Sequence, residues 1–455
     1  MAETFSKYTH LIATGGKYFL YNLTSGRVCA LDNRMFDTLA DNFNDPGKIE
    51  TLNPEMHAAL KQGGFIADVS GDETERLIKR FEEQESDPAL FEIIVNPTLD
   101  CNLRCWYCYE EHLKGTDMRA PVLDSIKRLI ERKTSDPALR HLAVTFFGGE
   151  PLLRYKSVVK PLLTYAVGLC RQKNIGFNTG FTTNGFLLTH KMFEELSELG
   201  LAGTSFQISF DGNRETHDKS RVYDPLHPTF DRMLEAVRAG AEMGFRMCAR
   251  FNYTPDNLDS FNDVVDIMSG WDEQIRKNIT VNFQQVWQTS DGISNDTKGH
   301  ASAMQKRIRE LGMTADCDMV YHRHVCYADR ANNIVVNYNG DVYKCTARKF
   351  DREKREGVLS PDGEIIYQNS YNRRMSIKFA NKACRECVIM PICNGRCSQN
   401  KLEKSDTEKC FLDMDNKQRE RYLLGSIIQK ITKESLSDSE LAEITIDRHL
   451  SIFNI

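Results

Sequence analysis

The sequence lacks the features that mark a membrane protein, a secreted protein or a nucleic-acid-binding protein. No uninterrupted apolar run approaches the ~20 residues that a membrane span needs. The first residues, MAETFSKYTH, have neither the basic start nor the apolar stretch of a secretory signal. Lysine and arginine total 59 against 64 aspartate and glutamate residues, a net charge of −5, which argues against a broad electrostatic surface for nucleic acid. We therefore expect a cytoplasmic protein whose partners include neither a membrane nor a nucleic acid.

Internal repeats of fixed period and low-complexity tracts are also absent. The chain has 455 residues, of which 41% are hydrophobic and 27% charged, the composition of a folded globular protein rather than a disordered one. Since an average domain takes about 150 residues, this length suffices for about three domains.

Fourteen cysteines require an explanation, because a reducing cytosol does not sustain a framework of disulfides. Three of them stand together at 101–108, and eight fall between 317 and 410. Clustered cysteines in such a compartment are usually metal or redox ligands, whereas isolated ones are usually buried small hydrophobes. We therefore predict that the isolated Cys29, Cys170 and Cys248 are buried and that the two clusters carry the chemistry.

Residues 1–88 are predicted to form a small winged-helix-like module. Two strand-like runs around the turn-forming Thr24-Ser25-Gly26 predict a β-hairpin over Lys17–Leu31. Two helical patterns and an acidic, helix-prone connection follow the hairpin. The expected elements are strands Lys17–Asn22 and Arg27–Leu31 and helices Asn33–Asn42, Pro54–Gln62 and Asp72–Asp87.

Residues 89–310 alternate buried strands with amphipathic helices, which predicts a parallel α/β sheet. Six units are too few for a closed eight-stranded barrel, so we expect an open, partial (β/α)6 barrel. In such a fold, chemistry belongs at the carboxyl ends of the strands. The expected strands are Phe91–Val95, His141–Phe147, Phe177–Thr183, Ser205–Phe210, Phe245–Asn252 and Thr280–Trp287, and the expected helices include Val122–Lys133, Lys156–Gln172, Lys191–Leu199 and Phe230–Met243.

Residues 311–415 show little periodicity and are predicted to form a loop-rich domain, followed by a helical tail over 416–455. One hairpin is expected there, with strands Ile334–Tyr338 and Asp341–Lys344 around the tight turn Asn339-Gly340. Such a loop-rich segment cannot build a large core unaided, so we expect metal ligands to supply the missing constraint.

A compact motif, Cys101-x3-Cys105-x2-Cys108, follows the first predicted strand of the barrel. Three thiolates on one loop can hold three irons of a four-iron cluster. The fourth iron then lacks a protein ligand, as in metal sites that keep an open catalytic position. The alternative is a zinc site, for which only His112 offers a nearby fourth ligand.

This motif, with an aromatic residue before its last cysteine, resembles the signature of the radical S-adenosylmethionine (radical SAM) superfamily. Family-like segments end the next three predicted strands in the expected order, and Arg221 follows Ser209 by twelve residues in a Ser…His-Asp…Arg pattern. The segments are Gly148-Gly149-Glu150, Thr182-Thr183-Asn184-Gly185 and Ser209-Phe210-Asp211-Gly212.

The resemblance implies a four-iron cluster on the three cysteines, reductive cleavage of S-adenosylmethionine and an electron donor such as flavodoxin or ferredoxin. It also implies the cofactor contacts. Tyr107 would lie over the adenine, Ser209 would meet the ribose, and Arg221 would bind the carboxylate, for which its planar fork is suited. The remaining contacts would come from Gly148, Gly149 and Glu150, which would receive the methionyl amino group, and from the loop residues Thr182 and Asn184.

The second cysteine group resembles the SPASM extension of radical SAM enzymes, which carries two auxiliary four-iron clusters. By this resemblance, one cluster would be bound by Cys384, Cys387, Cys393 and Cys410. The other would be bound by Cys326, Cys345 and Cys397, with Cys317, which lies outside the seven-cysteine pattern, as the fourth ligand. The alternative is a pair of zinc ribbons, because thiolates bind zinc as well as iron–sulfur clusters.

Two positions help to choose among the reactions of SPASM enzymes, which act mainly on peptides and proteins. Sulfatase-maturating members typically have Gln before the Gly-Gly-Glu segment and Asp after the cysteine that corresponds to Cys345. Here these positions are Phe147 and Thr346. Because the missing carboxylate removes the base expected for oxidising a cysteine or serine side chain, a sulfatase-maturating-type enzyme is the second choice.

The N-terminal module resembles the leader-recognition modules of enzymes that modify ribosomally made peptides, which bind the leader as an added strand. The alternative for this module is a plain structural extension. We therefore expect a peptide maturase acting on a precursor peptide with a leader, most specifically by making a cross-link such as a thioether. No catalytic residue is identified. The alternative of another class is a non-catalytic, zinc-dependent peptide-binding protein.

Overall fold

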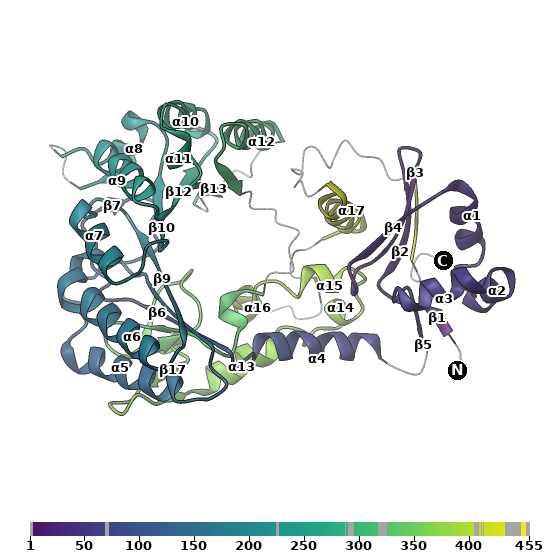
Figure 1. Cartoon of the computed structure of the whole chain (residues 1–455), viewed down its shortest axis with the longest axis horizontal. Helices are drawn as coiled ribbons and strands as arrows, with labels where there is room; N and C mark the ends of the chain where they lie inside the picture. The colour runs from purple at the N-terminus through teal and green to yellow at the C-terminus, as the bar shows by residue number, and fades with distance from the viewer. Residues whose placement is uncertain are drawn as a thin grey trace. The chain divides into compact units, whose positions relative to one another are not determined.

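The computed structural model contains two compact units. The barrel unit comprises residues 87–318 and 327–373, and the terminal unit comprises residues 1–86, 319–326 and 374–455 (Figure 1). No described helix combines the length and the apolar composition that a bilayer span requires. The described residues are 3–68, 72–223, 227–286, 288–289, 295–316, 325–404, 409–410, 412, 414–432 and 447–451.

Six parallel strands form the body of the sheet in the barrel unit, and they follow one another in chain order. All six were predicted from the alternation of apolar runs, to within two residues at each described end; Trp287 lies outside the described residues. The prediction of a partial α/β barrel is therefore confirmed. The strands are β6 (Leu90–Val95), β8 (His141–Phe146), β9 (Gly176–Thr183), β10 (Ser205–Phe210), β12 (Arg246–Tyr253) and β13 (Ile279–Gln285).

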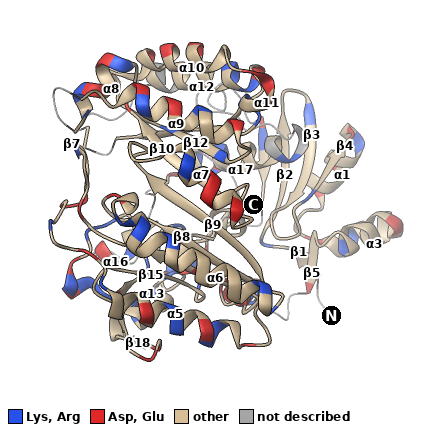
Figure 2. Cartoon of the chain, turned by 60° about the vertical axis from the view of Figure 1, so that its left-hand side comes forward, with Lys and Arg blue, Asp and Glu red and all other residues tan. Residues whose placement is uncertain are grey.

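Amphipathic helices between these strands cover the sheet. Helix α5 (Ala120–Thr134) buries Leu123, Ile126, Leu129 and Ile130, the three- and four-residue spacing of one helix face. Charged residues are concentrated on the helices, whereas the ribbons of the central strands are almost free of them (Figure 2). The other helices are η1 (Pro151–Arg154), η2 (Tyr155–Val159), α6 (Lys160–Gln172), α7 (His190–Glu198), α8 (Arg214–Ser220), α9 (Phe230–Glu242), η3 (Leu258–Ser260), α10 (Phe261–Ser269), α11 (Glu273–Arg276) and α12 (Asn295–Glu310).

The sheet extends beyond the six predicted strands on both sides. Strand β14 (Thr314–Asp316) pairs with β13, and β15 (Asn333–Val336) pairs in parallel with β6. The hairpin of β15 and β16 (Asp341–Tyr343) was predicted, but its attachment to β6 was not, because strand alternation reveals no long-range partner. The sheet ends with the antiparallel β17 (Gly357–Leu359) and β18 (Ile365–Tyr367), and short η4 (Tyr327–Asp329) and η5 (Arg352–Lys354) lie nearby in the chain.

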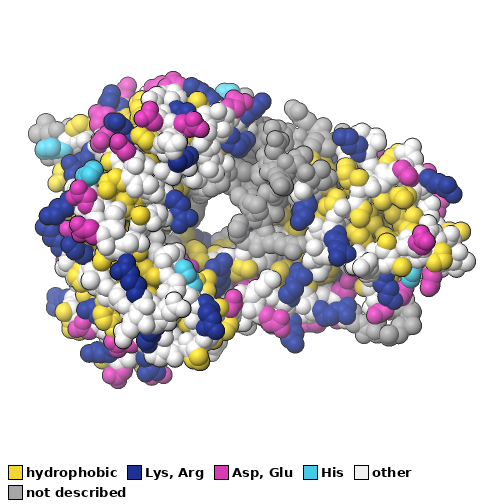
Figure 3. All heavy atoms as spheres, viewed as in Figure 1, with side chains coloured by type: hydrophobic (Ala, Val, Ile, Leu, Met, Phe, Trp, Pro, Cys, Tyr) yellow, Lys and Arg dark blue, Asp and Glu magenta, His cyan; other side chains and the backbone are white. Residues whose placement is uncertain are grey.

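In the terminal unit, the predicted hairpin and helices are confirmed within a larger sheet. Strands β3 (Lys17–Asn22) and β4 (Arg27–Leu31) have the predicted bounds. The sheet order is β19-β2-β3-β4, so β4 is an end strand, and neither β2 (Thr9–Thr14) nor β19 (Arg448–Leu450) was predicted. Hydrophobic side chains gather on the visible face over β4 and α1 (Figure 3). The helices are α1 (Asn33–Asp41), α2 (Pro46–Leu52), α3 (Pro54–Gln62) and α4 (Glu73–Glu85), and the strands β1 (Glu3–Phe5) and β5 (Ile66–Asp68) pair with each other.

Short helices dominate the rest of the terminal unit. They include α14 (Lys382–Arg385), α15 (Met390–Cys393) and α16 (Ser398–Glu403), and α13 (Asn369–Ile377) leads into them from the barrel unit. The predicted helical tail is present as α17 (Asn416–Thr432), whose Tyr422, Leu423 and Ile427 pack with Tyr21 and Ile12 of the N-terminal sheet.

The three isolated cysteines differ in their surroundings. Cys170 is buried in α6, as predicted. The prediction for Cys29 is wrong, because the thiol is exposed on the end strand β4, which has a neighbour on one side only among the described strands. Cys248 is partly buried and lines a cavity inside the barrel rather than sitting in the core.

Candidate functional site

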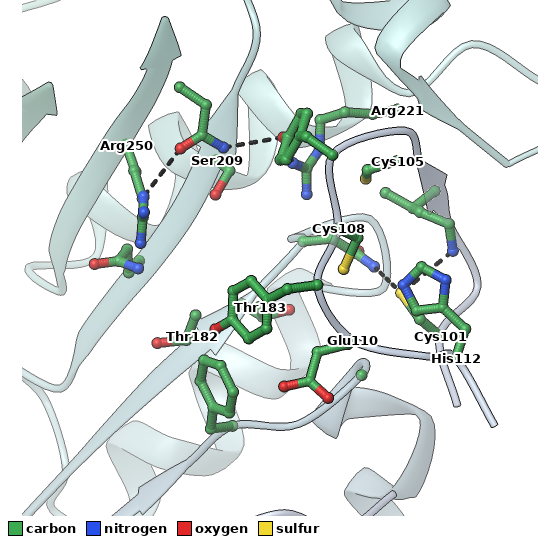
Figure 4. A pocket seen from close by; sticks show the side chains of 18 of the residues that line it. Cys101, Cys105, Cys108, Glu110, His112, Thr182, Thr183, Ser209, Arg221 and Arg250 are labelled. Carbon is green, nitrogen blue, oxygen red and sulfur yellow. Dashed lines mark hydrogen bonds between the residues drawn. The ribbon is translucent and has the colours of Figure 1, made fainter. Parts of the chain in front are cut away.

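A pocket lies at the carboxyl ends of the barrel strands, where the fold class places chemistry. It brings together the three cysteines of the first motif and residues of four strand-end segments (Figure 4). Of the residues predicted from the resemblance, those that line it are Cys101, Cys105, Cys108, Tyr107, Gly148, Gly149, Thr182, Asn184, Ser209 and Arg221.

The cysteine loop is fixed to the strand that carries Arg221. The two-residue strands β7 (Arg104–Cys105) and β11 (Arg221–Val222) pair with Cys105 opposite Arg221. At the other end of the motif, the Cys101 Sγ accepts a hydrogen bond from the backbone of Leu103 at 3.4 Å, and the Asn184 amide lies 3.7 Å from the same sulfur. The loop therefore holds its thiols toward the pocket.

The three thiols fit the ligand set of a cluster. Burial raises the pKa of Cys101 to about 12 and that of Cys108 to about 11, so these groups ionise only beside a cationic partner, which an iron–sulfur cluster supplies. Among the described residues, no three His, Cys, Asp or Glu side chains are arranged around a single metal ion. In a four-iron cluster, by contrast, each thiolate binds a different iron. Its ligands therefore need not converge on one point but only surround a common space, as these three thiols do.

Gly148 and Gly149 lie against the backbone that leads into the cysteine loop. A Cβ atom on Gly149 would stand 2.2 Å from the Asp100 carbonyl oxygen, and one on Gly148 would stand 2.5 Å from that of Thr98. Gly148 also has φ +108°, a conformation that favours glycine. Only glycine at both positions lets this segment reach the pocket while packing on the loop.

Glu150 lies beneath the pocket instead of lining it. Its carboxylate is fully buried and accepts hydrogen bonds from Thr183 Oγ1 at 2.7 Å, from the Asn184 backbone at 2.7 Å and from the Leu152 backbone at 3.0 Å. The segment Gly148-Gly149-Glu150 was predicted to receive the amino group of the cofactor. Its two glycines line the pocket, whereas the Glu150 carboxylate links the ends of β8 and β9 and positions Asn184.

A buried hydrogen-bond network surrounds the Tyr107 hydroxyl. This hydroxyl donates to Asp211 at 2.7 Å and accepts from Arg221 Nη1 at 2.8 Å and from Asn252 Nδ2 at 2.9 Å. Arg221 also lies 3.7 Å from the Asp211 carboxylate, which balances its charge. The Arg221 Nε is buried without a hydrogen-bond partner among the described residues, so a donor remains for a ligand.

Several pocket residues were missed by the sequence analysis. Glu110, two residues beyond the last cysteine, is 8% exposed, and burial together with Glu111 raises its pKa to about 8. Arg250 and Asn252 face the barrel interior from alternate positions of β12, a signal that the sequence contained. The others include Tyr109, Gln207, Gln285 and Gln288. His112, named above only as the fourth ligand of an alternative zinc site, also lines the pocket.

In the second cysteine group, six described cysteines belong to the terminal unit, and four of their thiols lie near one another. Burial raises the pKa of Cys393 to about 11, and the thiols of Cys387, Cys384 and Cys410 raise it further, whereas Arg396 lowers it. These are the four residues predicted for one auxiliary cluster. For the other predicted set, Cys326 and Cys397 belong to the terminal unit and Cys345 to the barrel unit, and Cys317 lies outside the described residues, so this set stays a prediction.

Comparison with protein families identifies one domain. A model of the Radical SAM superfamily matches residues 95–268, which include all the predicted pocket residues from Cys101 to Arg221.

Three curated relatives are similar in sequence. The chain is 21% identical to the radical SAM cyclopropyl synthase TigE of Paramaledivibacter caminithermalis, over 93% of this chain and 95% of that protein. It is 23% identical to the serine-type anaerobic sulfatase-maturating enzyme of Bacteroides thetaiotaomicron, over 67% and 81%. It is 29% identical to the Fe-coproporphyrin III synthase of Methanosarcina barkeri, but spans only 40% of that relative's length.

Two solved structures have the same fold. Native anSMEcpe with bound AdoMet and Kp18Cys peptide superposes with a TM-score of 0.58 at 18% identity, covering 76% of this chain and 99% of that one. Streptococcus suis SuiB bound to precursor peptide SuiA has a TM-score of 0.50 at 15% identity, covering 89% and 98%. At these identities the likeness concerns the fold alone.

Proposed function

Because this chain belongs to the radical SAM superfamily through residues 95–268, we propose that it is a maturase that modifies a ribosomally made peptide. The chain is an enzyme of that superfamily, which leaves the non-catalytic, zinc-dependent binding protein without support. The auxiliary clusters, the precursor peptide and the electron donor belong to the proposal.

The pocket residues divide the work of holding the cofactors. Cys101, Cys105 and Cys108 would hold the four-iron cluster, and Gly148 and Gly149 would let S-adenosylmethionine approach the backbone. The remaining donor of Arg221 would bind the cofactor's carboxylate, with Tyr107 and Ser209 beside it. When bound, the cluster and S-adenosylmethionine supply an adenosyl radical that abstracts a hydrogen atom from the substrate. The chain's contribution is to orient the cofactor and to exclude water from the pocket.

The observation that supports a peptide substrate is the open edge of β4. No described strand pairs with its outer side, and Cys29 and Ala30 of β4 are exposed, as is Met35 of α1, the helix that follows β4 in the chain. An extended leader can add as a strand to such an edge and place apolar side chains on the neighbouring surface. The similarity to the cyclopropyl synthase extends over 93% of this chain, far beyond the 174 residues, 95–268, that match the superfamily model.

A sulfatase-maturating-type activity is the second candidate, because the similarity to such an enzyme covers 81% of that relative. The two positions that depart from the pattern, Phe147 and Thr346, both line the cavity inside the barrel. The cavity therefore lacks a carboxylate at the expected place. We propose a cross-link such as a thioether, for which the adenosyl radical would take a hydrogen atom from a substrate carbon. The thiol would lose a proton and bond to that carbon, and the remaining electron would pass to one of the proposed auxiliary iron–sulfur clusters.

A candidate precursor peptide, sought among the short peptides encoded near the gene, tests the proposed reaction. The reconstituted enzyme, S-adenosylmethionine and a reductant should convert it to a product lighter by two hydrogen atoms, which mass spectrometry detects. A sulfatase-derived peptide containing Cys or Ser serves as the comparison. Oxidation of that peptide, with the encoded peptide left unchanged, would favour the second candidate.

Removing the Arg221 side chain is expected to weaken S-adenosylmethionine binding by about 1.5–3 kcal/mol, because a charge-assisted hydrogen bond is lost. Arg221→Lys should restore this only in part, since an ammonium lacks the planar fork. Equilibrium dialysis of the reconstituted protein measures both. Arg214→Ala is the matched control, because Arg214 is an exposed residue of α8 that pairs with the exposed Asp231 of α9. Equal affinities in Arg221→Ala and Arg214→Ala would contradict the assignment.

Two neighbouring proline substitutions test the β4 edge in the full-length chain. Successive N–H groups of an end strand point alternately to the inner partner and to the open side, so Cys29→Pro and Ala30→Pro remove one donor of each kind. The substitution that removes the inward N–H should lower the thermal stability. The other, which removes the outward N–H, should leave the stability unchanged and abolish binding of the precursor peptide. In that stable variant, S-adenosylmethionine cleavage without peptide should also stay unchanged. Full peptide affinity in that stable variant would refute leader binding at β4.

A further inference from the structure

A second cavity lies inside the barrel and continues the cofactor pocket. The two share the lining residues Tyr109, Phe147, Thr182, Gln207 and Arg250, so they adjoin each other. The inner part is lined mainly by uncharged residues from the strands and from the loop that follows Cys345. Its polar residues include Thr145, Ser205, Gln284, Tyr327 and Thr346.

Arg250 is the one charged residue among those that line the inner cavity. It extends from β12, where it lies opposite Ser209 in the register, on the side of the pocket away from the three cysteines (Figure 4). Its Nε donates to the Asn252 Oδ1 at 3.0 Å, which fixes the plane of the guanidinium. Asn252 in turn donates to the Tyr107 hydroxyl, so the orientation is tied to the cofactor network.

The positive charge of Arg250 is not balanced within the described part of the chain. No described carboxylate forms an ion pair with it, although Glu110 lines the same pocket. Arg221, by contrast, has Asp211 beside it. A partly buried guanidinium without a counter-charge is costly, and its fork of parallel donors fits a carboxylate with two hydrogen bonds.

The cofactor does not account for this charge. The carboxylate of S-adenosylmethionine is assigned to Arg221, next to the cysteine loop, whereas Arg250 lies where the pocket adjoins the inner cavity and lines both. The group that Arg250 awaits therefore belongs to the molecule that enters the inner cavity.

We propose that Arg250 binds a carboxylate of the substrate and thereby selects a peptide that presents an acid next to the site of hydrogen abstraction. This rests on the proposed function, because it deepens the choice of a peptide substrate. The carboxylate belongs either to an Asp or Glu side chain or to the carboxyl end of a peptide, and both present the same two oxygens.

Three N-acetylated pentapeptides distinguish these sources. The first is acetyl-Gly-Ala-Asp-Ala-Gly-amide, the second has Asn in place of Asp, and the third has Asn and a free terminal carboxylate. Anaerobic calorimetry measures the dissociation constant of each with the reconstituted enzyme saturated with S-adenosylmethionine. The wild-type enzyme should bind one of the two acidic peptides about tenfold more tightly than the neutral one, or better.

Three variants assign that preference to Arg250. Arg250→Gln should abolish it, and Arg250→Lys should keep part of it because the charge remains without the fork. Arg246→Gln is the matched control, since Arg246 is exposed on the same strand and donates to the Gly203 carbonyl. Its preference should equal that of the wild type.

Equal constants for the three peptides in the wild-type enzyme, including binding too weak to measure for all of them, would overturn the inference. A preference that survives Arg250→Gln would do the same. A loss of S-adenosylmethionine affinity in Arg250→Gln would assign the residue to the cofactor and also overturn it. If the enzyme prefers acidic peptides but modifies no precursor peptide, the proposed function is refuted and the carboxylate site at Arg250 stands.

Discussion

Replacing Cys101, Cys105 and Cys108 together by alanine is expected to abolish cleavage of S-adenosylmethionine and to remove about one third of the iron. The three thiols line the same pocket as Gly148 and Arg221, so the cofactor would lose the metal on which it is cleaved. The auxiliary set around Cys393 lies in the terminal unit and should keep its iron. Iron per chain and the yield of 5′-deoxyadenosine, both measured after anaerobic reconstitution, test the two parts.

A double variant, Cys29→Ala with Cys170→Ala, controls for the loss of thiols as such. One of these cysteines is exposed on β4 and the other is buried in α6, and neither lines the pocket. Its iron content and activity should equal those of the wild type. Retained cleavage in a triple variant verified to lack the pocket cluster would disprove the cofactor assignment.

The second large effect is expected for Gly149→Ala. The new methyl group would meet the Asp100 backbone at 2.2 Å, and backbone cannot yield as the end of a side chain can. The strand-end segment or the start of the cysteine loop must move, at a cost of about 1–3 kcal/mol in stability. We expect a lower melting temperature and at least tenfold weaker S-adenosylmethionine binding, because both moving segments line the pocket.

Gly168→Ala is the matched control for that substitution. Gly168 lies on the exposed side of α6, and a Cβ atom there would meet no atom within 4 Å. Alanine is the better helix former, so this variant should be as stable as the wild type or more stable, by up to about 1 kcal/mol. Unchanged melting and affinity in Gly149→Ala would show that the close approach is absent in solution.

The sequence was most informative where a local pattern determines the structure. Buried runs of strand length alternating with helices predicted all six central strands, and the strand ends then located the pocket residues. The Tyr107, Asp211 and Asn252 contacts could not be predicted, because they join segments up to 145 residues apart. The buried position of Glu150 could not be predicted either, because a motif does not reveal which neighbouring groups will donate hydrogen bonds to its carboxylate.

Long-range pairing explains the remaining differences. The hairpin around Asn339-Gly340 was predicted from its turn, yet nothing in β15 specifies β6 as its parallel neighbour. Cys29 was predicted to be buried because it stands apart from the cysteine clusters, but its exposure depends on β4 being the last described strand of its sheet. Arg250 was passed over because it lies in the middle of a strand rather than in a motif.

The sheet of the terminal unit has a consequence for protein synthesis. Strand β2 leaves the ribosome well before β19, which pairs with it and begins at Arg448, about 430 residues later. At about 5–20 residues per second, a nascent chain exposes the free side of β2 for roughly 20–90 s. During that time the growing chain has an unpaired edge at β2 in addition to the one at β4, and other polypeptides can pair with either. Production should therefore depend on chaperones that shield nascent chains, and slower growth at low temperature should lengthen this vulnerable interval.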